Sequence, residues 1–85
     1  MKRIEYVIAA SEGIHARPAG FLVKTVSGFA SEVQVLFGDK TASGRKLFAI
    51  MKLGAKQGDT ITVTAEGEDE ENAIEAISAF LKANF

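Results

Sequence analysis

The chain has 85 residues, of which 47% are hydrophobic and 25% charged, a balance that predicts one compact domain spanning residues 1–85. It contains no cysteine, which excludes disulfides, thiolate metal sites and thiol redox chemistry. The net charge is −1, but basic side chains predominate over residues 15–56 and acidic ones over residues 59–75, so the first stretch should attract anionic partners.

We expect no export signal in the N-terminal segment, because Glu5 interrupts an apolar run that is too short for a signal peptide or a membrane span. We therefore expect a cytoplasmic protein. Residues 2–8 alternate between apolar and polar side chains, which predicts a half-buried strand. Apolar residues at helical spacing over 18–29 predict a helix, and 32–37 with 40–43 predict a β-hairpin.

The second half of the chain predicts three more elements. Residues 45–54 are dense in apolar side chains and end in Gly54, which indicates a short helix with surplus apolar surface. Residues 60–65 alternate between threonine and apolar side chains, as a strand does. Asp69 or a neighbour can cap a final helix that extends to the C-terminus. The order βαββαβα predicts an α+β fold, with an antiparallel sheet and helices on one face.

Pro18 limits where the first helix can begin, because a proline inside a helix removes a hydrogen bond and clashes with the preceding turn. It must lie in the first turn, so the N-cap residue is His15, Ala16 or Arg17. The bias of a pre-proline residue against helical angles favours Arg17, whereas the longest helix favours His15. In either case, N–H groups around Ala16 and Arg17 lack helical acceptors and form an anion-binding helix end.

His15 is the only histidine and lies beside this helix end. Its neutral imidazole is an available nucleophile, and the guanidinium of Arg17 can bind two phosphate oxygens at once. On composition alone, a lone histidine near a helix start is more often incidental than catalytic. Histidine is, however, a poor N-cap residue, and Gly13 leaves the approach sterically open. The pattern therefore indicates a nucleophile beside a phosphate site.

The run GIHARPAG, residues 13–20, resembles the active-site signature of the HPr family, the histidine-containing phosphocarriers of the bacterial phosphotransferase system. RKLFAIMKLG, KQGD and TVTAEGEDE match later segments of that family at the expected spacing, so the resemblance covers essentially all 85 residues. It implies an open-faced β-sandwich, a four-stranded antiparallel sheet with three helices on one face. It also implies a carrier rather than an enzyme in the strict sense, and we expect no cofactor and no metal ion.

The resemblance implies that enzyme I supplies the phosphoryl group to Nδ1 of His15, that Arg17 binds the phosphate, and that sugar-specific A domains receive it. The family positions that contact partners match Gly20, Lys24, Leu47, Phe48 and Met51. An apolar patch rimmed by lysines would suit acidic partner proteins. The alternative is that Leu47 and Met51 simply belong to the core.

Lys46 is a departure from many family members, which carry a regulatory serine at the matching position. Lysine cannot accept the phosphate that a dedicated kinase places on that serine, so we expect no such regulation here. The departure leaves open whether the chain is the general carrier or a dedicated paralogue for one sugar or for a non-sugar pathway. The sequence does not identify that pathway.

Other classes of protein fit the sequence less well. An RNA-binding module would share the element order, but it uses paired strand aromatics and a basic charge, which this chain lacks. A metal protein is disfavoured by the single histidine and by an acidic cluster that suits a helix cap better than a calcium loop. An unphosphorylated regulatory module with a carrier fold remains open. We expect a monomer that binds neither nucleic acid nor membrane.

Overall fold

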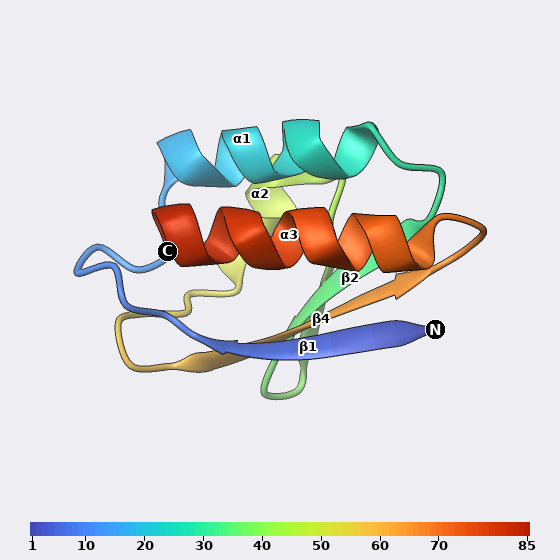
Figure 1. Cartoon of the computed structure of the whole chain (residues 1–85). Helices are drawn as coiled ribbons and strands as arrows, with labels where there is room; N and C mark the ends of the chain where they lie inside the picture. Colours follow the sequence, from blue (N-terminus) through green and yellow to red (C-terminus); the bar gives the residue numbers. More distant parts are fainter.

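The computed structural model describes residues 1–85 and has the predicted order of elements (Figure 1). α1 begins at Ala16, one of the starts that the sequence leaves open, and α2 is shorter than the apolar run of residues 45–54. The elements are β1 (Lys2–Val7), α1 (Ala16–Ser27), β2 (Glu32–Phe37), β3 (Lys40–Ser43), α2 (Leu47–Lys52), β4 (Thr60–Glu66) and α3 (Glu70–Asn84).

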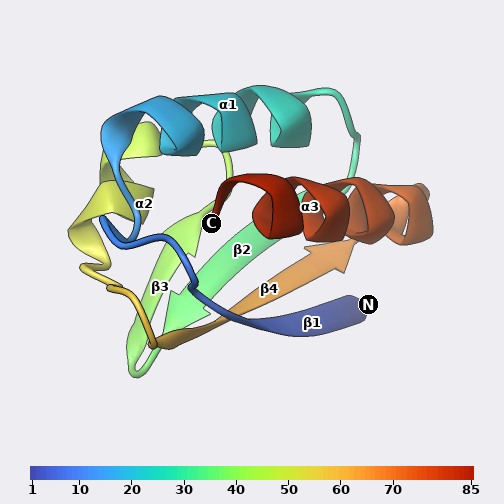
Figure 2. The same cartoon turned by 60° about the vertical axis from the view of Figure 1, so that its left-hand side comes forward.

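The four strands form one antiparallel sheet in the order β1-β4-β2-β3. Alternation in β4 turns Ile61, Val63 and Ala65 toward the core and its threonines toward the other face. All three helices cover the same face of the sheet (Figures 1 and 2). The prediction of an open-faced β-sandwich is therefore confirmed.

One hydrophobic core of 17 buried residues lies between this sheet and the helices. Leu22 and Val26 anchor α1, and Ile77 and Leu81 anchor α3, each with at most 2% of its surface exposed. Burial of one such side chain contributes roughly 1.5–3 kcal/mol, so these contacts fix both helices on the sheet. The start of α1 thereby comes to lie beside the end of α3 (Figure 1). No helix combines the length and the hydropathy that crossing a membrane requires.

Asp69 occupies the N-cap position of α3, but its carboxylate does not cap that helix. It accepts hydrogen bonds from the N–H groups of Ala30 (2.8 Å) and Ser31 (2.9 Å) and from the Ser31 hydroxyl. The expectation of a side-chain cap from Asp69 is therefore wrong, because the loop between α1 and β2 takes up the same oxygens. Asp69 fastens this loop to the start of α3.

Asp69 should also make the stability of the fold depend on pH. The hydrogen bonds from the Ser31 hydroxyl and the Ala30 N–H hold the pKa of Asp69 below 3.8. A carboxyl group whose folded pKa is depressed stabilises the fold above its unfolded pKa and loses that contribution as the pH falls through the folded value. We expect Asp69→Asn to be less stable than the wild type at neutral pH, and to lose less additional stability on acidification from roughly pH 5 to pH 2.

Urea unfolding at a series of pH values measures this difference. Glu68→Gln, which removes a neighbouring exposed carboxylate, is the matched control and should follow the wild-type profile. Parallel profiles for the wild type and Asp69→Asn would contradict the role of Asp69.

Candidate active site

His15 is the N-cap residue of α1, which decides between the three positions that the sequence leaves open. Its backbone is extended (φ −134°, ψ 168°), and its carbonyl oxygen accepts the N–H of Ala19 at 3.0 Å. Arg17 is helical although it precedes Pro18. Pro18 and Ala19 are buried in the packing of α1, and this burial outweighs the local preference against helical angles at Arg17.

The start of α1 is free to receive an anion. The first hydrogen bond of the helix runs from the Ala19 N–H to the His15 carbonyl oxygen, so the N–H groups of Ala16 and Arg17 have no acceptor within the helix. The His15 side chain does not cap them either. Arg17 is exposed and takes part in none of the three salt bridges of the chain. Two N–H donors, the positive end of the helix and a guanidinium therefore lie together. Nowhere do three or more histidine or acidic side chains gather to hold a metal ion.

The His15 imidazole is partly buried and has neighbours on two sides. Its Nδ1 lies 2.9 Å from the carbonyl oxygen of Gly13. Its ring meets the ring of Phe85 nearly at a right angle, with centroids 6.3 Å apart and an interplanar angle of 81°. A carbonyl oxygen only accepts hydrogen bonds, so Nδ1 carries the proton in this contact. Nδ1 can act as a nucleophile only after this hydrogen bond has been broken.

Gly13 has a backbone conformation that fixes the path of the loop between β1 and α1, which leads to His15. Its φ is +66°, and an added Cβ would lie 2.6 Å from the carbonyl oxygen of Ala55. The same oxygen accepts the N–H of Ile14 at 3.1 Å, so the loop is held tightly against residue 55. We expect Gly13→Ala to destabilise the fold by about 2–4 kcal/mol, through backbone strain and steric overlap together.

Gly38→Ala is the matched control for this prediction. Gly38 has a similar φ of +60°, but nothing lies within 4 Å of its added Cβ, so this variant carries the strain without the overlap. Chemical denaturation should show a clearly larger loss for Gly13→Ala. Equal losses for the two variants would mean that the close approach to Ala55 is unimportant.

A shallow hollow lies between the start of α1 and the end of α3. Phe21, one turn after Arg17, is 53% exposed beside it. Phe21 is not among the predicted site residues, although it follows Arg17 by four residues and so lies on the same helix face, a spacing that could have revealed it. The lining residues are His15, Arg17, Pro18, Phe21, Ala83 and Asn84.

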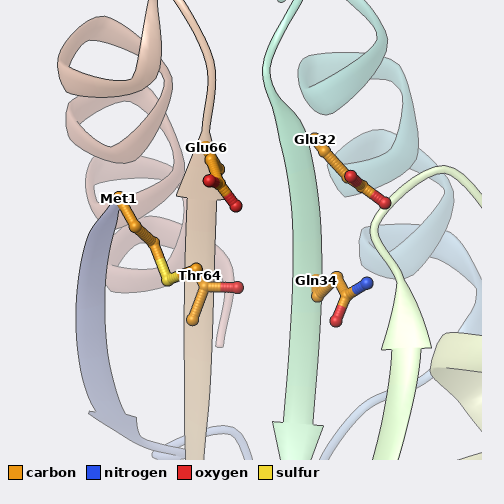
Figure 3. Close-up of a pocket in the computed structure, with 5 residues that line it drawn as sticks. All are labelled: Met1, Glu32, Gln34, Thr64 and Glu66. Carbon is orange, nitrogen blue, oxygen red and sulfur yellow. The ribbon is translucent and has the colours of Figure 1, made fainter.

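A second pocket lies on the open face of the sheet, on the side away from the helices (Figure 3). Glu32 of β2 and Glu66 of β4 are directly paired there, so two like charges face each other. The pocket contains neither His15 nor Arg17 and belongs to a different surface. Its lining residues are Met1, Glu32, Gln34, Thr64 and Glu66.

The predicted partner residues lie on α1 and α2, two helices that pack against each other (Figure 2). Phe48 is 74% exposed and is a true surface residue. Leu47 and Met51 are partly buried and pack against the core, so the core interpretation holds for part of each side chain. Lys24 is exposed, and apart from its neighbours and the backbone of its own helix, nothing lies within 4 Å of a Cβ added at Gly20.

Comparison with known proteins identifies the family. The family model described as the PTS HPr component phosphorylation site matches residues 2–83. The chain belongs to the HPr family. It is 43% identical over 74 residues to the phosphocarrier protein HPr of Haemophilus influenzae, and the match covers 87% of each chain. Membership of the HPr family identifies a phosphocarrier of the phosphotransferase system.

Solved HPr structures share the fold. HPr-C-His from Thermoanaerobacter tengcongensis is 37% identical and superposes with a TM-score of 0.92, covering 98% of this chain and 93% of that one. An HPr dimer from the same organism, also 37% identical, gives a TM-score of 0.77 and covers 98% and 95% of the two chains. The likeness therefore extends over nearly the whole chain.

Proposed function

We propose that this HPr-family chain accepts a phosphoryl group from phospho-enzyme I on Nδ1 of His15 and donates it to sugar-specific A domains. The observation that carries the proposal is the position of His15 at the N-cap of α1, beside the free N–H groups of Ala16 and Arg17. A phosphoryl group on Nδ1 is negatively charged, and the helix end and the Arg17 guanidinium stabilise that charge.

Acceptance requires the ring of His15 to leave Gly13. A turn of roughly 180° about the Cβ–Cγ bond exchanges Nδ1 with a ring carbon, and solvent then carries the Nδ1 proton to Nε2. The Nδ1 lone pair forms a bond to phosphorus, while the bond from phosphorus to the donor atom of enzyme I breaks and its electron pair stays with that donor. In the transfer to the A domain, a nucleophile of that domain forms a bond to phosphorus. The bond from phosphorus to Nδ1 breaks, and its electron pair returns to Nδ1. Positioning and charge stabilisation supply most of the catalysis.

The proposed partner surface comprises Gly20, Lys24, Leu47, Phe48 and Met51. A glycine inside a helix costs roughly 0.5–1 kcal/mol relative to alanine, and no contact within the chain requires one at Gly20. Close approach of a partner protein to this position accounts for it. The exposed ring of Phe48 supplies an apolar anchor, and the charge of Lys24 favours encounter with acidic partners.

Incubation with enzyme I and labelled phosphoenolpyruvate tests the proposal. We expect an acid-labile label on the chain, and its loss when an A domain is added. A chain that binds enzyme I but takes no label would instead be the unphosphorylated regulatory module. Labelled chain that donates to only one A domain would identify a dedicated paralogue.

Lys46 supports a further element of the proposal, the lack of serine-linked regulation. It is the N-cap residue of α2, is exposed, and makes no side-chain cap. We expect no ATP-dependent phosphate on the chain from a kinase that phosphorylates this position in relatives, and labelling of Lys46→Ser by the same kinase. Serine at an N-cap should also stabilise the fold by about 0.5–2 kcal/mol. Phosphate on the wild-type Ser43, the nearest hydroxyl, would contradict this prediction.

We also propose that residues 1–85 act as a single cytoplasmic domain and as a monomer. Analytical ultracentrifugation checks the oligomeric state directly, a relevant measurement because a relative from Thermoanaerobacter tengcongensis is described as a dimer.

A further inference from the structure

Phe85 lies outside the signature GIHARPAG, yet it contacts the histidine within it. Phe85 is 4% exposed, and its ring packs against the His15 imidazole at a centroid distance of 6.3 Å and an angle of 81°. This is an edge-to-face arrangement, which is directional and restricts the relative tilt of the two rings. The contact therefore joins residue 85 to His15, the N-cap residue of α1.

Phe85 is itself held by backbone contacts on both sides. Its N–H donates to the carbonyl oxygen of Leu81 at 2.8 Å, and its own main-chain oxygen accepts the N–H groups of Ala9 and Ala10 at 2.5 and 2.6 Å. Its ring also meets the ring of Phe80, with centroids 6.1 Å apart. The end of α3 is thereby fastened to the loop between β1 and α1 (Figures 1 and 2). Phe85 therefore has little freedom to follow a moving imidazole.

We infer that Phe85 is a positioning residue that fixes the plane of the His15 imidazole during phosphoryl transfer. Two contacts restrain the ring in different ways. The hydrogen bond to Gly13 selects which edge of the ring carries Nδ1, whereas the Phe85 ring restricts the orientation of the ring plane. A half-turn about the Cβ–Cγ bond breaks the first restraint but leaves the plane unchanged, so the packing on Phe85 persists. The freed Nδ1 then enters the hollow in a defined direction.

The inference rests on the proposed function of His15, but part of it can be measured without phosphorylation. In Phe85→Leu the side chain stays apolar while the aromatic ring is lost. Proton NMR of the unphosphorylated protein should then show that the His15 ring protons lose the ring-current shift from Phe85. Ile77→Val is the matched control, because Ile77 is fully buried on α3, the helix that Phe85 follows, and is not part of the aromatic contact with His15. It should keep the His15 shifts of the wild type.

Kinetics of phosphorylation by phospho-enzyme I provide the second measurement. We expect kcat of Phe85→Leu to fall by about three- to tenfold with KM for the carrier unchanged, because the ring gains orientations that do not react. Ile77→Val, which removes one buried methylene group from the core, should keep the wild-type kcat. Equal kcat values for Phe85→Leu and Ile77→Val would overturn the inference. A rise in KM at constant kcat would also overturn it, since Phe85 would then act in docking.

The two proposals can fail separately. If His15→Ala accepts phosphate as the wild type does, the proposed function is wrong, whatever Phe85 does. If His15 is the acceptor but its NMR shifts and kcat do not respond to Phe85→Leu, only the positioning role is wrong.

Discussion

His15→Ala is expected to accept no phosphoryl group from phospho-enzyme I, because the chain has no second histidine that could replace it. The variant should still fold, since it loses only one hydrogen bond and one aromatic contact, together worth about 1–3 kcal/mol. The measurement is the acid-labile label taken up from phosphoenolpyruvate, with circular dichroism to verify the fold. If folded His15→Ala takes up label at the wild-type rate, the acceptor is a residue other than His15.

Arg17→Ala is expected to slow transfer by about 10- to 100-fold, which corresponds to the loss of a charged hydrogen bond to phosphate. Stability should change little, because Arg17 is exposed and takes part in none of the salt bridges. Arg17→Lys should recover only part of the rate, since an ammonium group cannot bind two phosphate oxygens in the fork geometry of a guanidinium. Rapid-quench measurement of label transfer gives these rates.

Lys24→Ala is the control for Arg17, because it removes a positive charge from the same helix without removing a donor at the N-terminal end. It should weaken encounter with partners and make transfer more sensitive to salt, while the rate at saturation stays near that of the wild type. If Arg17→Ala and Lys24→Ala behave alike, Arg17 contributes only to the general charge of the surface.

The strands, the helices and the covered face of the sheet can be predicted from sequence because they depend on local patterns. The alternation in residues 60–65 identifies an inner strand, and the apolar spacing in residues 18–29 identifies the buried face of α1. The hairpin of β2 and β3 follows from two short alternating segments on either side of a turn. Each of these patterns involves neighbours in the chain, so no knowledge of long-range contacts is required.

The details that the sequence leaves open depend on contacts between distant residues. Local preferences favour both Arg17 and His15 as the N-cap residue, Arg17 because it precedes a proline and His15 because it gives the longer helix. The burial of α1 favours His15. Asp69 is a good cap by residue type, but its carboxylate accepts hydrogen bonds from the N–H groups of Ala30 and Ser31 instead. Such contacts join residues that lie far apart in the sequence, which is why local propensity does not reveal them.

The candidate site also has one part that the sequence predicts and one part that depends on contacts between distant residues. GIHARPAG indicates the proposed nucleophile and the proposed phosphate-binding arginine, because both lie within one turn of a helix start. The Phe85 ring that packs on His15, and Ala83 and Asn84 of the hollow, come from the far end of the chain. They become neighbours of His15 only because α1 and α3 lie side by side in opposite directions (Figure 1).

We propose that Nδ1 of His15 carries the phosphoryl group, and NMR of the phosphorylated protein shows which atom bears the phosphorus. With nitrogen-labelled histidine, we expect a single phosphorus signal coupled to Nδ1 of His15, which disappears on mild acid treatment. A phosphorus signal coupled to Nε2, or an acid-stable ester on a serine or threonine, would contradict it.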